Sequence, residues 1–257
     1  MPLSNGTREY VQSLERGLRV LTAFSADTPR LSLSDAAKLT GLTRATARRC
    51  LRTLMELGYV SSDGKSFQLT PHVLEIGYAY LSSARFSEIA EPFMERLSEK
   101  LDESVSLAVL DEAQIVYIAR VPTKRIMSIG LALGSRLPAA ATSMGRVLLA
   151  SLDATVLENY LQKSPLRKYT NHTIVSPAKF LNELASVKVQ GYALVDQELE
   201  AGLRSIAVPL RDSNGSVLAA LNVGTQTDRV SKRRIMYEIL PELQSTAQEI
   251  NTVLSRR

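Results

Sequence analysis

The chain has 257 residues, of which 45% are hydrophobic, and a net charge of +5, which suits two globular domains of ordinary size. No apolar run approaches the roughly 18 residues that a membrane span requires, and the first residues lack the pattern of an export signal. One cysteine and two histidines exclude an internal disulfide and a metal cluster built on those side chains, so we expect a cytoplasmic protein without a cofactor.

The positive charge is concentrated near the N-terminus. Residues 1–70 contain ten Lys and Arg against six Asp and Glu, which gives this part +4 of the total +5. A basic excess confined to one small domain favours a polyanionic partner such as nucleic acid, although many protein surfaces are mildly basic.

The same seventy residues predict short helices. Apolar residues at steps of three and four predict a first helix after the N-cap Ser13, with a stripe of Leu14, Leu18, Leu21 and Phe24. Pro29 ends this segment, and Ser34 is expected to cap a second helix that packs through Ala36, Ala37 and Leu39. The sequence Thr40-Gly41-Leu42 then predicts a turn, with glycine where a positive φ is expected.

A basic helix is predicted from its N-cap Thr43 to about Leu57, and Gly58 is a typical residue to follow it. Helical spacing places on the core side Ala47, Cys50, Leu51, Leu54 and Leu57. The opposite side carries Ala45, Arg48, Arg49, Arg52 and Glu56, with Arg44 and Met55 flanking. Cys50 is therefore interpreted as a small core residue and not as a reactive thiol.

Spacing alone leaves two interpretations of the arginine face. It could be solvated surface on which Arg52 and Glu56 form an ion pair one turn apart. It could instead enter the major groove of DNA, where guanidinium groups bind guanine O6 and N7 or grip phosphates. A short helix, a glycine-containing turn and a basic helix form the helix-turn-helix pattern, which favours DNA.

A hairpin is predicted directly after the basic helix. The short β-like segments Tyr59–Ser61 and Ser66–Leu69 flank Asp63-Gly64, a strong hairpin signal, and a hairpin at this place is typical of a wing. The first turn of the recognition helix is the usual site of base contacts. The predicted DNA-binding residues are Thr43, Arg44, Ala45, Thr46, Arg48, Arg49, Arg52 and Lys65.

We expect three parts in the chain: residues 1–70 as a winged helix-turn-helix, 71–84 as a linker helix opened by Thr70-Pro71, and 85–257 as a larger domain. The larger domain opens with a helical stripe of Ile89, Phe93, Leu97 and Leu101. Strand-like segments are Val105–Leu110, Gln114–Val121, Met127–Leu133, Tyr192–Asp196, Ser205–Leu210 and Val217–Val223. Helical patterns cover Ala141–Ala150, Ala154–Leu161, Pro177–Gln190 and Ser231–Leu254. This grouping predicts an α+β fold with a mostly antiparallel sheet.

The larger domain carries no recognisable catalytic signature. The sequence has no GxGxxG, Walker loop, GxSxG or HExxH motif. His172 stands in a polar loop, and the sequence assigns no nucleophile to it. An enzymatic function is therefore not expected.

Several motifs, in chain order, resemble the IclR family of bacterial regulators over essentially the whole chain. They are Val11–Leu18, the helix start Thr43–Thr46, Leu54–Val60, and the region containing Gly191, Asp196, Glu198 and Gly202-Leu203-Arg204. Within the family, residues 45–49, Phe67–Leu74 and Gly77–Ser83 are similar to the Pca/Pob-type regulators of protocatechuate, p-hydroxybenzoate and β-ketoadipate catabolism.

The resemblance implies a ligand-responsive regulator whose C-terminal domain binds a small carboxylate effector. It also implies dimers, often paired into tetramers, on a palindromic operator of double-stranded DNA. By position, the effector site is expected to include Ile126, Ile129, Leu137, Ser143, Met144, Asp196, Leu203, Ser205 and Asn222. A cysteine is common in the family at position 205 and a serine at 222, so this pocket differs chemically from its relatives.

The residues themselves support this site less strongly. Ser143 at a helix start could present its hydroxyl and backbone N–H groups to a carboxylate, with Arg146 or Arg204 adding a charged hydrogen bond. Ordinary roles remain the alternative: Ser143 as a cap, Asp196 as a turn or ion-pair residue, and the apolar positions as core.

Three alternatives to a regulator of aromatic-acid catabolism stay open. The chain could regulate another small-carboxylate pathway, could be an enzyme with a DNA-binding appendage, or could be a non-specific architectural DNA binder. The missing catalytic motifs argue against the enzyme, and a nearly neutral remainder of the chain argues against the architectural protein.

Overall fold

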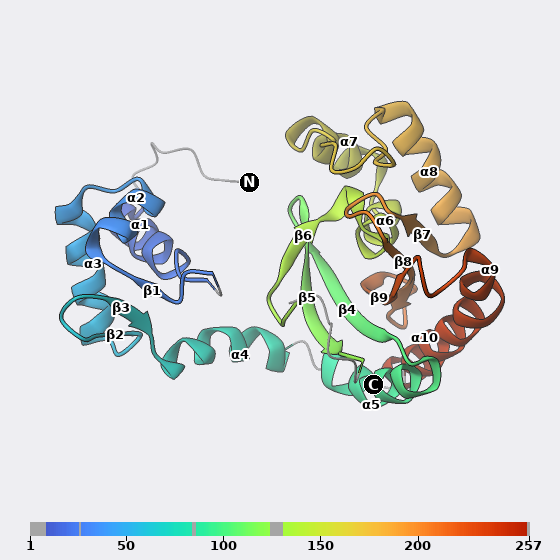
Figure 1. The fold of residues 1–257 in the computed structure, drawn as a ribbon, viewed down its shortest axis with the longest axis horizontal. Helices are drawn as coiled ribbons and strands as arrows, with labels where there is room; N and C mark the ends of the chain where they lie inside the picture. The colour runs from blue at the N-terminus through green and yellow to red at the C-terminus, as the bar shows by residue number, and fades with distance from the viewer. Residues whose placement is uncertain (1–8, 26, 84–85, 124–130, 256–257) are drawn as a thin grey trace. The chain divides into compact units, whose positions relative to one another are not determined.

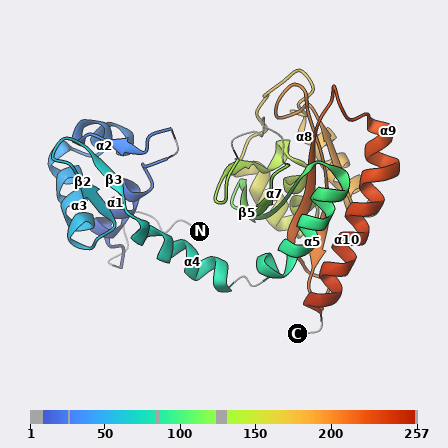
Figure 2. The same ribbon diagram turned by 60° about the horizontal axis from the view of Figure 1, so that its bottom comes forward.

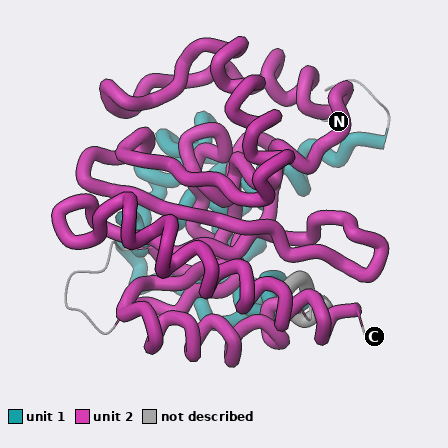
Figure 3. Tube along the Cα trace, turned by 90° about the vertical axis from the view of Figure 1, so that its right-hand side faces the viewer, with its two compact units in different colours: residues 1–83 teal, residues 84–257 magenta. Residues whose placement is uncertain are grey.

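The structure, a computed structural model, describes residues 9–25, 27–83, 86–123 and 131–255. The chain divides into two units, residues 1–83 and residues 84–257, which Figure 3 colours separately. Within the described ranges, no helix is both long and apolar enough to cross a membrane.

The first unit is a small helical bundle with a three-stranded antiparallel sheet (Figure 1). Its elements are α1 (Gln12–Leu21), β1 (Arg30–Leu31), α2 (Leu33–Thr40), α3 (Arg44–Glu56), β2 (Val60–Ser62), β3 (Phe67–Leu69), η1 (Pro71–Val73) and α4 (Leu74–Ser83). The sheet order is β1-β3-β2, so the hairpin β2–β3 that follows α3 is extended by a short strand from before α2. This arrangement confirms the predicted winged helix-turn-helix.

The expected helix starts in this unit were wrong in two places. The N-cap of α2 is Ser32, whose side chain and that of Asp35 form a reciprocal capping box, and Ser34 lies inside the helix. The N-cap of α1 is Val11, without a side-chain hydrogen bond, instead of Ser13.

The core of the first unit also differs from the expected stripe. Buried side chains are Val20, Phe24, Leu31, Ala36, Leu51, Leu54 and Val60. On α1, Leu14 and Leu18 are 62% and 50% exposed, because the core-facing side of the helix carries Val20 instead. Leu39 of α2 is likewise exposed.

The second unit contains a six-stranded antiparallel sheet with helices on both faces. Its elements are α5 (Phe86–Leu101), β4 (Ser104–Asp111), β5 (Gln114–Val121), β6 (Arg136–Pro138), η2 (Ala139–Ala141), α6 (Ser143–Ala150), α7 (Ala154–Lys163), α8 (Pro177–Gln190), β7 (Ala193–Asp196), β8 (Leu203–Arg211), β9 (Val217–Gln226), α9 (Lys232–Arg234), η3 (Ile235–Ile239) and α10 (Leu240–Leu254). The strand order is β6-β5-β4-β9-β8-β7, which confirms the predicted antiparallel α+β fold.

The two faces of this sheet are covered by different helices. Helices α5 and α10 pack side by side on one face (Figures 1 and 2), where α5 contacts β4 and β5 and α10 contacts β8. Helices α6 and α8 pack together over the other face, and α6 contacts β4, β8 and β9. Small residues of the sheet, Ala108, Ala207 and Ala220, let α6 approach closely.

Two expectations for the second unit need correction. The buried stripe of α5 is Ala90, Met94, Leu97 and Leu101, so the predicted Ile89 and Phe93 lie at its edge and are half-buried. The expected strand Met127–Leu133 falls mostly outside the described residues, and the third strand of this region is β6. The closing helical segment contains a π-helical stretch, η3, just before Pro241, a residue that has no N–H to donate in a regular helix.

Candidate functional sites: a basic helix face and a pocket beside the sheet

Helix α3 is positioned by local signals at both of its ends. Gly41, with φ of 66°, ends α2 in the left-handed region, and Leu42 donates its N–H to the carbonyl of Ala37. Thr43 then caps α3, because its Oγ1 accepts the N–H of Thr46 at 3.2 Å. The helix runs Arg44–Glu56, which confirms the helix predicted from Thr43 to about Leu57.

The face of α3 that packs on the core is narrower than predicted. Ala47, Leu51 and Leu54 are buried, whereas Cys50 is half-buried and Leu57 is 57% exposed. Leu57 is the C-cap that follows Glu56, the last residue of the helix.

The opposite face presents cations that the protein leaves without partners. The predicted residues Thr43, Arg44, Ala45, Arg48, Arg49, Arg52 and Lys65 are exposed, and Thr46 is half-buried. Among the described residues, none of the four arginine side chains forms an ion pair or an intramolecular hydrogen bond, and the Arg52–Glu56 pair does not form. A face of unpaired guanidinium groups beside a small residue is suited to bind phosphates and base edges.

The hairpin β2–β3 is organised by the carboxylate of Asp63. This carboxylate accepts the N–H groups of Ser66 at 2.7 Å and Lys65 at 2.9 Å, and Arg30 from β1 lies 3.1 Å away. These bonds, first those from Ser66 and Lys65, lower the pKa of Asp63 to about 2. The turn is thus fixed with the Lys65 side chain exposed at its tip.

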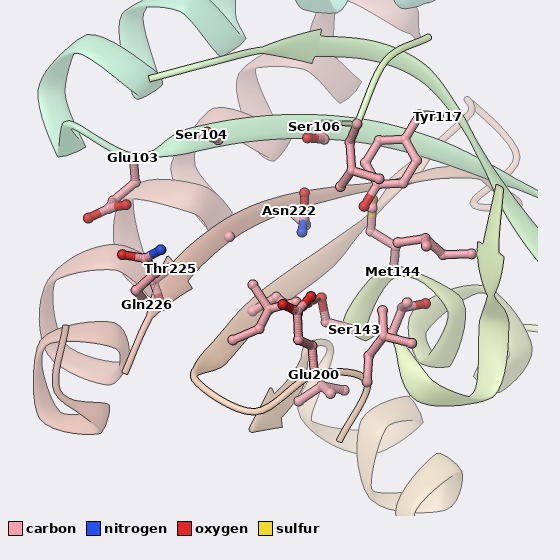
Figure 4. A pocket seen from close by; sticks show the side chains of 18 of the residues that line it. Glu103, Ser104, Ser106, Tyr117, Ser143, Met144, Glu200, Asn222, Thr225 and Gln226 are labelled. Carbon is pink, nitrogen blue, oxygen red and sulfur yellow. Dashed lines mark hydrogen bonds between the residues drawn. The ribbon is translucent and has the colours of Figure 1, made fainter. Parts of the chain in front are cut away.

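A pocket of about 140 Å³ lies in the second unit between the sheet and the start of α6. Figure 4 shows Ser106, Tyr117 and Asn222 entering it from the sheet, and Ser143 and Met144 from α6. Arg120, Ser106 and Asn222 form one row across three adjacent strands, since Ser106 pairs with both of the others. The pocket floor therefore contains a polar row, and Ser104 and Ser205 of the same sheet add further hydroxyl groups.

A β-bulge places two of the floor residues on the same side of β5. Leu107 pairs with Ala119 and the next residue, Ala108, pairs with Tyr117, so Ile118 is the extra residue of the bulge. In a regular strand Tyr117 and Arg120, three positions apart, would face opposite sides. The bulge brings both into the pocket.

The helix side of the pocket is held by small hydroxyl residues. Thr142 caps α6, its side chain accepting the N–H of Gly145 at 3.1 Å, and Ser143 is the first helical residue. The hydroxyl of Ser143 hydrogen-bonds that of Ser205 on β8 at 2.9 Å, which ties the helix start to the sheet. Both hydroxyls line the pocket.

The pocket lining carries two cations, Arg120 and Arg229, and two carboxylates, Glu103 and Glu200. Arg229 is paired with the buried carboxylate of Glu103. Arg120 is half-buried, and within the described part of the chain it forms no ion pair or hydrogen bond. Burial lowers the pKa of the Arg120 guanidinium, because the charged form loses solvation, and the neighbouring Tyr117 acts in the opposite direction. Burial likewise raises the pKa of Tyr117 to about 12, so its phenol stays protonated and able to donate.

The structure brings together six of the residues expected at the effector site: Leu137, Ser143, Met144, Leu203, Ser205 and Asn222. Ile126 and Ile129 lie outside the described residues. Asp196 does not line the pocket, because its neighbour Val195 does and side chains alternate along β7. Asp196 instead forms ion pairs with Arg204 and Lys232, each at 2.8 Å.

The two arginines considered as partners for a carboxylate are used elsewhere. Arg146 is 1% exposed, and its guanidinium lies 2.6 Å from the Glu198 carboxylate. Arg204 donates to Asp196 and to the carbonyl of Val230. Sequence reasoning missed Arg120, Tyr117 and Ser106, and a signal existed only for Arg120, which is the one charged residue of β5.

The described residues contain no group of three or more His, Cys, Asp or Glu side chains that could hold a metal ion. His172 is in an exposed loop, where its N–H donates to the hydroxyl of Thr170.

Comparison with known proteins matches both units to one family. Residues 13–64 match the IclR helix-turn-helix domain, and residues 78–252 match the profile described as bacterial transcriptional regulator IclR C-terminal. The chain is 43% identical over 246 residues to the Pca regulon regulatory protein of Pseudomonas putida, covering 95% of this chain and 84% of that one. It is 39% identical over 253 residues to the p-hydroxybenzoate hydroxylase transcriptional activator of Acinetobacter baylyi, covering 96% and 93%.

A solved structure is similar over both units. The crystal structure of an IclR homolog complexed with 4-hydroxybenzoate, from Microbacterium hydrocarbonoxydans, matches with a TM-score of 0.83 at 27% identity. The match covers 94% of this chain and 98% of that one.

Proposed function

Because this chain belongs to the IclR family of bacterial transcriptional regulators, we propose that it controls genes of aromatic-acid catabolism in response to an aromatic carboxylate. One observation carries the proposal: a helix with an unpaired arginine face is joined in one chain to a pocket whose lining includes the unpaired cation Arg120. The family regulates transcription and is not enzymatic, which agrees with the absence of catalytic motifs in the sequence.

The DNA contacts are assigned to the exposed face of α3 and to the wing. Arg44, Ala45, Thr46 and Arg49 lie in the first two turns, where recognition helices usually meet base edges. Arg48 and Arg52 continue the same face and are proposed to grip phosphates, and Lys65 is proposed to contact the backbone or minor groove. A regulator with these contacts works where the chromosome is, in the cytoplasm.

The effector is assigned to the pocket between α6 and the sheet. Its volume of about 140 Å³ is close to that of a cavity able to hold one benzene ring, about 150 Å³. Leu137, Met144 and Leu203 supply apolar contacts for a ring, and Arg120 supplies the counter-charge that a carboxylate needs. A relative bound to 4-hydroxybenzoate supports the same ligand class.

The working form is proposed to be a homodimer, or a pair of dimers, on a palindromic operator. The first unit exposes six large apolar side chains on two helical segments: Val11, Leu14, Leu18, Leu74, Ile76 and Tyr78. Such a concentration on a small unit is typical of an association surface. A two-fold dimer matches the symmetry of a palindrome with half-sites about one helical turn apart.

Two measurements on the full-length protein test this function. Selection from random double-stranded DNA should enrich a palindrome that binds roughly 10³-fold or more tightly than random sequence. In a thermal-shift series with 4-hydroxybenzoate, protocatechuate and the aliphatic β-ketoadipate, an aromatic acid should raise the melting temperature, because a ligand that binds only the native state stabilises it. The ligand must also change operator affinity, since coupling requires unequal binding to the two states. A response to a different small carboxylate alone would reassign the pathway.

A substitution in the pocket separates sensing from DNA binding. Ser143→Leu places a large side chain at the helix start, where the serine hydroxyl now bonds Ser205. The effector response should be lost while operator binding is retained. An unchanged response would refute the assignment of the pocket.

A further inference from the structure

Asn222 carries an acceptor for which the folded protein supplies no donor. Its side-chain oxygen, Oδ1, is buried without a hydrogen-bond partner, and no other side-chain N or O atom among the described residues is left in this state. The residue is only 6% exposed. A buried acceptor without a donor costs about 1–3 kcal/mol, so such a group in a native structure points to a missing partner.

The position of Asn222 shows where that partner has to come from. It lies on β9 between Ser106 of β4 and Ala207 of β8, and its side chain lines the pocket (Figure 4). The neighbours in its row are Ser106 and, one strand further, Arg120. No side chain among the described residues donates to this oxygen, so a group in the pocket is well placed to satisfy the amide.

The chemistry of an amide limits which group this is. A primary amide offers two N–H donors on one side and a carbonyl acceptor on the other, and turning it by 180° exchanges them at nearly constant shape. A carboxylate satisfies only the N–H side, because it accepts and does not donate. A phenolic hydroxyl both accepts and donates, so it satisfies the amide in either orientation.

We propose that Asn222 is a specificity-determining residue that recognises a ring hydroxyl of the effector, while Arg120 binds the carboxylate. This inference rests on the proposed function and narrows it, from aromatic carboxylates in general to those that carry a hydroxyl group. A water molecule can fill the same role in the free protein. A ring without a hydroxyl displaces that water and leaves the carbonyl unpaired, so it loses affinity.

Isothermal titration of the full-length protein with two matched ligands tests the proposal. The probes are 4-hydroxybenzoate and 4-fluorobenzoate, which are similar in size and charge, but only the first can donate a hydrogen bond from the ring. Wild type should bind the hydroxy compound at least about tenfold more tightly. Asn222→Leu, which is close in shape but has no amide, should reduce this ratio to about one, chiefly by strengthening binding of the fluoro compound.

Two kinds of control separate a loss of recognition from a loss of folding. Asn222→Ala is measured beside the leucine variant, and the melting temperature of each shows that it is folded. Asn182→Leu makes the same change on the exposed surface of α8 and should keep the wild-type ratio. A wild-type ratio near one, or a ratio unchanged in both Asn222 variants, would overturn the proposal while leaving the aromatic-acid class intact. Failure of the wild type to bind either compound would refute the ligand class itself.

Discussion

The backbone of Gly145 faces that of Ala139 so closely that a β-carbon on Gly145 would lie 2.0 Å from the Ala139 carbonyl oxygen. This contact folds η2 back onto the first turn of α6. Ala141 at the end of η2 and Ser143 at the start of α6 both line the pocket. The absence of a side chain at position 145 therefore sets the position of one pocket wall.

Gly145→Ala should destabilise the second unit. The atoms that a β-carbon would meet belong to the backbone of Ala139, which cannot turn aside as a flexible side chain can. We expect a loss of about 1–3 kcal/mol or more, the usual effect of overpacking a core. Calorimetric unfolding of the full-length protein measures it. Gly17→Ala in α1 is the matched control: its β-carbon meets nothing within 4 Å, so helix propensity should raise stability by about 1 kcal/mol. Equal effects of the two substitutions would contradict the steric argument.

Arg49→Ala and Lys65→Ala should affect DNA binding in different ways. If Arg49 contacts a base edge, its loss costs about 1–3 kcal/mol on the preferred operator and relaxes selectivity at one position. Lys65 at the wing tip should weaken binding to all sequences and reduce the salt dependence, as expected of a phosphate contact. Competition binding against random DNA at several salt concentrations separates these results. A uniform loss in the Arg49 variant would make it a phosphate contact.

How far the sequence could predict this molecule depends on how local each signal is. The bounds of α3 follow from Thr43 and Gly58, which act on adjacent backbone, and they were predicted closely. The faces of the sheet depend on distant pairing. The bulge at Ile118 changes which β5 residues reach the pocket, and no sequence signal marks it. Asp196 was placed in the pocket by position, but alternation along β7 gives that place to Val195.

The burial of Arg146 could not be predicted from the sequence either. An arginine in a helix start such as Ser143–Arg146 is ordinarily assigned to the surface. Here Arg146 is buried because it meets Glu198, 52 residues later in the chain, and also donates to the carbonyl of Ala140. Only the tertiary fold shows that the charge of Arg146 is already satisfied by Glu198, whereas Arg120 lines the pocket.

The wing should lose its order in acid because of Asp63. Its pKa in the folded chain, about 2, lies below the ordinary value of 3.8, since the N–H groups of Ser66 and Lys65 favour the ionised form. Because the pKa of Asp63 is lower in the folded chain than in the unfolded chain, its ionised carboxylate stabilises the wing. This stabilisation is fully present above about pH 4 and is lost as the pH falls towards 2. Titration of the Asp63 carboxyl carbon by NMR measures this pKa. Asp63→Ala should loosen the hairpin at neutral pH and weaken DNA binding without changing base preference. A carboxyl that titrates near 3.8 would contradict the proposed turn geometry.

Gly224→Leu should block the pocket while the fold survives. Gly224 lies on β9 in the pocket floor, paired on either side with Ser104 and Ser205, and a β-carbon there would meet no atom within 4 Å. Its backbone is not in the left-handed region, so a side chain is tolerated and extends into the space proposed for the effector. We expect the ligand-induced rise in melting temperature to disappear, and operator binding to lose its response to the ligand while keeping its affinity. Gly224→Ala, which fills less of the space, should give an intermediate loss of ligand affinity. If the leucine variant responds to ligand like the wild type, the effector binds elsewhere in the chain.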